Sequence, residues 1–114
     1  MLPLKKKKGR NPHNPHSGSE LKALANAVEK LHGATALFVE TEQVNEQFGG
    51  AIVWTGLVSR FELHGHPSAT VCYAWSEPAT SKRGQRFYAV LQTPEINSPE
   101  KAVRASIVAD HKAT

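Results

Sequence analysis

The chain has 114 residues, of which 39% are hydrophobic and 21% are charged, and these values are typical of a single domain that buries its own core. One cysteine, Cys72, excludes an intrachain disulfide. No apolar run approaches the roughly 18 residues that a membrane span needs. No apolar stretch follows the first lysines, as it would in a signal peptide. We therefore expect a cytoplasmic protein that does not enter a membrane.

The net charge of +4 is distributed unevenly along the chain. The first 16 residues contain three prolines, no acid and five basic side chains, namely Lys5, Lys6, Lys7, Lys8 and Arg10. The other residues contain nine Lys or Arg against ten Asp or Glu. A segment with this charge and no apolar spacing cannot offset its ordering entropy by burial. The sequence therefore predicts a disordered basic arm over 1–16 and one near-neutral domain over 17–114.

The first predicted element is a helix over 18–32. Ser17 and Glu20 have the spacing of a capping box, in which each side chain bonds the other residue's backbone N–H. Apolar side chains then recur at helical spacing, at Leu21, Leu24, Val28 and Leu31. Gly33 is a residue type that commonly follows the last turn of a helix.

Four β-rich segments follow, at 34–44, 51–63, 68–76 and 85–93. Their connections are short and polar, which favours antiparallel neighbours. Ser98, Pro99 and Glu100 then have the pattern of a helix start, and a last helix continues to about His111. The predicted fold class is α+β, a four-stranded antiparallel sheet with an N-terminal and a C-terminal helix in the order α-β-β-β-β-α.

Residues 62–75 read ELHGHPSATVCYAW and contain the pattern that most resembles a metal site. If Phe61 pairs with Val71 across the HGHPS turn, Cys72 lies opposite Arg60, about four residues or roughly 13 Å down the strand. Metal–ligand bonds are only about 2.0–2.3 Å long, so Cys72 cannot share a metal with His64 or His66. We expect an exposed turn, no metal ligands and no cofactor.

The same pairing assigns the strand residues to two faces, because side chains alternate along a strand. One face becomes the predicted core, with Val53, Leu57, Phe61, Val71, Tyr73 and Trp75. The other face is too apolar to be exposed to solvent. Trp54 is predicted on this face, and so on the opposite side of the sheet from Trp75. The second face also receives residues of the last strand, and its register decides which: either Tyr88 and Val90, or Phe87, Ala89 and Leu91. Either a helix covers it, or it is an interface of a homo-oligomer, formed by Ile52, Trp54, Val58 and Ala74.

Basic side chains also gather at the tip of the third hairpin, near Tyr88, at Lys82, Arg83 and Arg86. Together with the five basic residues of the arm, they are candidates for binding the phosphates of nucleic acid. The chain contains no RRM, KH, zinc-finger or helix-turn-helix signature. A double-stranded-RNA-binding domain has the order α-β-β-β-α, from which this chain differs by an additional strand.

Three classes of function stay open, and no residue is identified as catalytic. The first is a small non-enzymatic interaction module that associates with itself through its sheet. The second is a nucleic-acid-associated accessory protein that binds phosphates through the arm. The third is a small enzyme or ligand-binding domain with a pocket between helix and sheet. We rank the three in this order.

Overall fold

Helix α2 (Gly18–His32) begins and ends where the sequence predicts. The computed structural model describes residues 16–78 and 84–113. In it the Ser17 side chain accepts a hydrogen bond from the Glu20 N–H, and the Glu20 carboxylate accepts one from the Ser17 N–H. Gly33 has a φ of 67°, which a glycine adopts without steric cost. The capping box and the terminal glycine are therefore confirmed.

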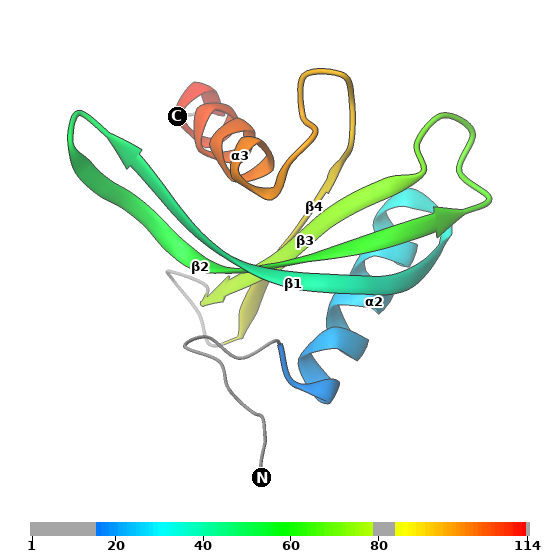
Figure 1. The fold of residues 1–114 in the computed structure, drawn as a ribbon. Coiled ribbons are helices and arrows are strands. Elements are labelled where there is room, and N and C mark those ends of the chain that lie inside the picture. The colour runs from blue at the N-terminus through cyan, green and yellow to red at the C-terminus, as the bar shows by residue number, and fades with distance from the viewer. Residues whose placement is uncertain (1–15, 79–83, 114) are drawn as a thin grey trace, which may run out of the picture.

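Four strands and a second helix follow, and they confirm the α+β fold class (Figure 1). They are β1 (Thr35–Phe48), β2 (Ala51–His64), β3 (Val71–Pro78), β4 (Gln85–Leu91) and α3 (Pro99–Ala113). The strands form one antiparallel sheet in the order β1-β2-β3-β4. In the part of the chain that the structure describes, no helix is long and apolar enough to cross a membrane.

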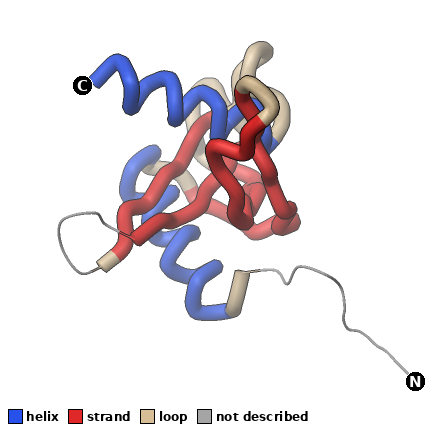
Figure 2. The backbone as a smooth tube through the Cα atoms, turned by 90° about the vertical axis from the view of Figure 1, so that its left-hand side faces the viewer, coloured by secondary structure: helices blue, strands red, loops and turns tan. Residues whose placement is uncertain are grey.

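The two helices lie on opposite faces of the sheet (Figures 1 and 2). On the α2 side, buried residues of the helix pack against buried strand residues that include Phe61, Cys72 and Ala74. On the α3 side, Ala102 and Val103 pack against strand residues that include Val44, Val58, Tyr73 and Trp75. Both faces of the sheet are thus covered within one chain.

The register between β2 and β3 differs by one residue from the predicted register. Phe61 pairs with Cys72 rather than with Val71. The turn is one residue longer than expected, because Leu63 donates its N–H to the Thr70 carbonyl rather than pairing with Ala69. Since the side-chain period of a strand is two, this shift moves every β3 side chain to the opposite face relative to β2.

The predicted division of the sheet into two faces is therefore wrong. Tyr73 and Trp75 lie on the α3 side with Val58, whereas Phe61 lies on the α2 side. Trp54 contacts Trp75 edge to face, with 5.9 Å between ring centroids, so the two tryptophans share a face.

Three further assignments to the faces can be compared with the structure. Tyr88 and Val90, the first of the two alternatives for β4, pack on the α3 side together with Trp54. Val53, predicted in the core, is 51% exposed. Leu57, predicted beside it, is half-buried.

Candidate functional site

The HGHP turn is held by His66. The Nδ1 atom of His66 accepts hydrogen bonds from the backbone N–H groups of Ser68 and Ala69, at 3.1 and 2.9 Å. The proton of the neutral ring is then on Nε2, which leaves no free lone pair for a metal. His64 is exposed and contacts Glu62 at 3.1 Å. Within residues 16–78 and 84–113, no group of three or more His, Cys, Asp or Glu side chains could hold a metal ion.

Cys72 is fully buried between the sheet and α2. Burial disfavours the thiolate and raises the pKa of the Cys72 thiol to about 12. A thiol with this pKa is not a nucleophile at neutral pH. The cysteine is therefore a packed side chain of the core.

A buried serine and histidine form a second arrangement that resembles a reactive site. Ser59 is fully buried, and its Oγ lies 2.6 Å from His16 Nδ1 and 2.7 Å from Thr41 Oγ1. Burial lowers the pKa of His16, and the nearby Glu20 carboxylate partly opposes this. A fully buried hydroxyl cannot meet a substrate, so the contact ties the chain before α2 to the sheet.

The position of His16 differs from the prediction that the arm extends to residue 16. This residue is 8% exposed and packed on the domain, although we assigned it to the arm. The other fifteen residues of the predicted arm, which include Lys5, Lys6, Lys7, Lys8 and Arg10, lie outside the described residues, so the rest of that assignment stays a prediction.

An aromatic array crosses the α3 side of the sheet near the end of the third hairpin. Trp75 stacks on Tyr88 with 5.1 Å between ring centroids, and the Arg86 guanidinium lies 4.8 Å from the Tyr88 ring centroid. Trp54 Nε1 donates to Glu77 at 2.6 Å. This array was not predicted, because the predicted register placed the two tryptophans on different faces.

The carboxylates around this array decide how it can interact with a phosphate. Asp110 accepts a hydrogen bond from Arg86 at 3.1 Å and one from the Tyr88 hydroxyl at 3.2 Å. Arg86 is therefore already paired, and a phosphate placed here would meet Asp110 and Glu77. Lys82 and Arg83, the other basic residues predicted at this hairpin, lie outside the described residues.

The four residues predicted at a subunit interface do not form one surface. Val58 and Ala74 are each 1% exposed, under α3 and α2 respectively, and so cannot take part in a surface contact. Trp54 is half-buried against Trp75. Ile52 alone is largely exposed, at 60%.

The helix α2 also caps backbone groups at both edge strands. Ala36 of β1 donates its N–H to Glu29 at 2.9 Å, and Ala89 of β4 offers its carbonyl to His32 Nε2 at 2.8 Å. Such groups would otherwise be available to pair with another strand. A register shift between Phe38 and Glu40 further interrupts the β1 edge, where the apolar side chain of Phe38 is exposed.

A hollow lies along the outer side of α3. It has a volume of about 540 Å³ and is lined by Glu95, Ile96, Lys101, Arg104, Ala105, Val108 and Ala109. A second hollow of about 410 Å³, between α3 and β4, shares Ala105 and Ala109 with the first. The two hollows adjoin at these two alanines, and we call them together the α3 groove. The groove was not predicted, because its lining residues come from the loop before α3, from α3 and from β4, which only the tertiary fold brings together.

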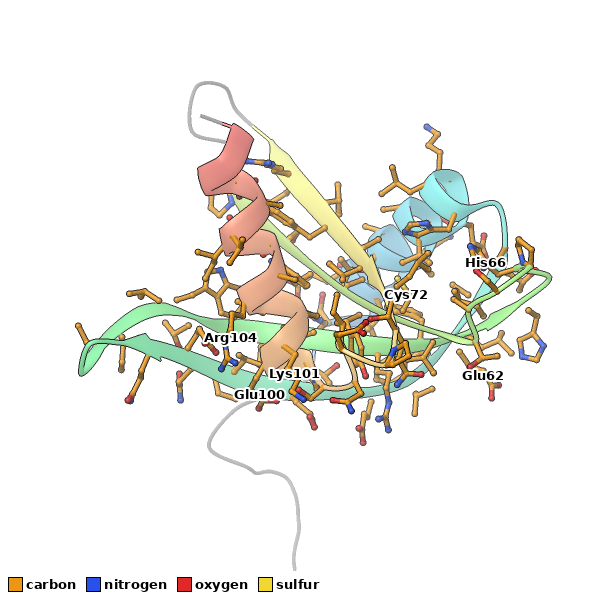
Figure 3. All side chains as sticks on the ribbon, turned by 90° about the horizontal axis from the view of Figure 1, so that it is seen from above. Glu62, His66, Cys72, Glu100, Lys101 and Arg104 are labelled. Carbon is orange, nitrogen blue, oxygen red and sulfur yellow. The ribbon has the colours of Figure 1, made fainter. Side chains whose placement is uncertain are left out.

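Charged side chains surround the groove where α3 begins, and one of them, Arg104, is paired with a strand residue. Arg104 Nε donates to the buried carboxylate of Glu46 on β1 at 2.6 Å, which fixes α3 on the hairpin, and this hydrogen bond raises the pKa of Arg104. Figure 3 shows Glu100, Lys101 and Arg104 together on the first half of α3, away from Glu62 near the end of β2 and from His66 in the HGHP turn. The rim is therefore a mixture of acidic and basic groups around an apolar floor.

The described residues form an α+β domain with a helix on each face of its sheet and an apolar groove along α3. Comparisons of the chain with models of protein families, with curated proteins and with solved structures give no match.

Proposed function

We propose that this protein is a small non-enzymatic interaction module, and that it binds a polypeptide partner in the α3 groove. The observation that carries the proposal is the groove itself, an apolar hollow with the exposed side chain of Val108 at its wall. Exposed apolar surface of this kind is typical of interaction sites. A helix or an extended segment of a partner would bury it.

The state of the reactive side chains supports binding rather than catalysis. Cys72 is buried with a raised pKa, and Ser59 is buried beneath His16 and Thr41. A catalytic nucleophile must reach its substrate, which neither side chain does. The first hollow of the α3 groove has lysine, arginine and glutamate at its rim and no serine, cysteine or histidine among its lining residues. In the second hollow, the Ser106 hydroxyl donates to the Val103 carbonyl of its own helix at 2.7 Å.

A photocrosslinking residue at position 108 tests the proposal. Benzoylphenylalanine placed there should form an adduct with another polypeptide when the full chain is irradiated in cells that express it. Leu31, an exposed leucine on α2, is the matched control position. Adducts from position 108 but not from position 31 are expected. Equal or no adducts from the two positions would contradict the proposal.

A second candidate, binding of nucleic acid through the arm, is favoured by the charge distribution of the sequence. The five basic residues of 1–16 stand before a domain with one more acid than base. Binding to a labelled oligonucleotide should weaken steeply with salt and show little sequence preference, because phosphates supply the affinity. A chain without residues 1–15 should lose most of this binding. Full affinity after the deletion would exclude the arm as the site.

A further inference from the structure

The α3 groove and the side chain of Val108, which could fill such a groove on another copy, lie on the same surface. We infer that the partner in the groove is a second copy of this chain, related by a twofold axis, with the two α3 helices packed antiparallel. This inference rests on the proposed function and names its partner. It places self-association on α3 rather than on the face of the sheet.

Helix α3 has two packing faces. Ala102 and Val103 on one face are buried against the sheet. Lys101, Ala105 and Val108 follow one another at spacings of four and three residues, which places them on the other side of the helix. The apolar part of this side, Ala105 and Val108, is not among the residues that pack against the sheet. It is therefore free to pack against another helix.

The second face is complementary to itself. Val108 is 48% exposed and projects from α3, while Ile96, Ala105 and Ala109 line the hollow beside it. In a twofold contact, residue i of one copy meets residue j of the other and the reverse holds as well. Val108 of each copy can thus enter the hollow of the other. The small side chains of Ala105 and Ala109 allow the two helices to approach closely.

The charges of α3 favour an antiparallel arrangement. The acids Glu95 and Glu100 lie near the beginning of the helix beside Lys101, whereas Arg104 is paired with Glu46, and Asp110 near the end of the helix is paired with Arg86. The sequence of the last turn is His111-Lys112. Antiparallel packing brings opposite ends of the two helices together. Both the side-chain charges and the helix dipoles are then complementary.

The edges of the sheet are less suited to a second copy. Glu29 and His32 already bond the outward backbone groups of Ala36 and Ala89. Two β1 edges paired around Thr41 would also bring Glu40 and Glu42 of one copy against those of the other. Like charges directly opposite on paired strands are destabilising. The α3 groove has no such conflict.

Sedimentation equilibrium of the full chain over a range of concentrations tests the inference. The chain should form a reversible dimer, and Val108→Asp should weaken its association at least about tenfold, because a charge would enter an apolar contact. Ala109→Arg should do the same by filling the groove. It lies at an exposed position, so it keeps the test valid if Val108→Asp does not fold. Ile52→Asp and Leu31→Asp are the controls at exposed apolar positions, and both should dimerise as the natural chain does.

Two results would overturn the inference. The first is a monomer at every concentration. If position 108 still crosslinks to a different polypeptide, the interaction module stands and only the second copy is wrong; if it crosslinks to none, both proposals fail. The second result is a dimer that Ile52→Asp dissociates and Val108→Asp and Ala109→Arg do not. The contact would then lie on the β2 surface around Ile52.

Discussion

Among the described residues, three histidines make hydrogen bonds that hold the fold, two of them between elements and one within a turn. His16 bonds Ser59 of β2, His32 bonds Ala89 of β4, and His66 bonds two N–H groups of its own turn. Spacing in the sequence drew attention to His64 and His66 as a pair, but the pair has no common task. A histidine's partners are set by the tertiary fold, so its role could not be predicted from its neighbours in the chain.

His66 should contribute more to stability than the exposed turn expected from the sequence would imply. The substitution His66→Ala removes the acceptor of the Ser68 and Ala69 N–H groups. We expect a loss of about 1–2 kcal/mol in the free energy of unfolding, because donors lose their partner. His64→Ala, which removes only an exposed contact with Glu62, should change it by less than about 0.5 kcal/mol. Urea denaturation of both variants measures the difference, and equal values would contradict this role.

His16 should make the stability of the domain depend on pH. Its pKa in the folded chain is lowered from 6.5, mainly by burial, so the unfolded chain takes up the proton first as pH falls. The stabilisation is complete above about pH 6.5 and is lost as pH falls from there towards the folded pKa. The groups that face the ring are Ser59, which is neutral, and Glu20, whose charge opposes the shift.

Urea denaturation at about pH 7.5 and about pH 5 measures this effect. His16→Gln should lose less of its free energy of unfolding between the two pH values than the natural chain loses. His64→Gln, at an exposed position, should behave as the natural chain does. A pH dependence that is the same in all three proteins would show that His16 is not the group responsible.

At the scale of elements, the ends of a helix could be predicted from a few neighbouring residues, whereas the register between strands could not. The capping box at Ser17 and the glycine at 33 are contained within a few residues, and both ends of α2 were therefore predictable. The β2–β3 register depended on the length of one turn. That length is set by His66, which bonds the N–H of Ala69 and so makes this residue part of the turn. This difference of one residue led to the prediction that Trp54 and Trp75 lie on opposite faces, although they share one.

Gly56 is required by the position of Trp54 on the sheet. A Cβ at residue 56 would lie 2.9 Å from Cη2 of the Trp54 ring. Gly56→Ala should displace the indole from Trp75 and Glu77 and cost about 1–3 kcal/mol, as overpacking does. Gly18→Ala, where a Cβ has open space, is the control and should be neutral or slightly stabilising. Thermal unfolding and tryptophan fluorescence report the change, and an unaltered emission spectrum in Gly56→Ala would contradict it.

At the scale of the whole molecule, the position of the helices determines which surface is left for a partner. The order of elements and the fold class followed from the sequence, because each element has its own periodicity and its own boundaries. The side of the sheet on which each helix lies did not follow. One helix packs on each face of the sheet, and α2 bonds one backbone group at each edge strand, so much of the sheet is covered within the chain. The outer side of α3 is then the surface on which the proposed function depends.

The most direct test of that proposal is the dependence of backbone amide chemical shifts on protein concentration, measured by NMR with the full chain. On dilution, we predict that the shifts change for the residues that line the α3 groove, in particular Ile96, Ala105, Val108 and Ala109. Residues of the HGHP turn should not change, since they lie at the other end of the molecule (Figure 3). Changes confined to β1 or to the surface around Ile52, or no changes at any concentration, would contradict self-association through α3.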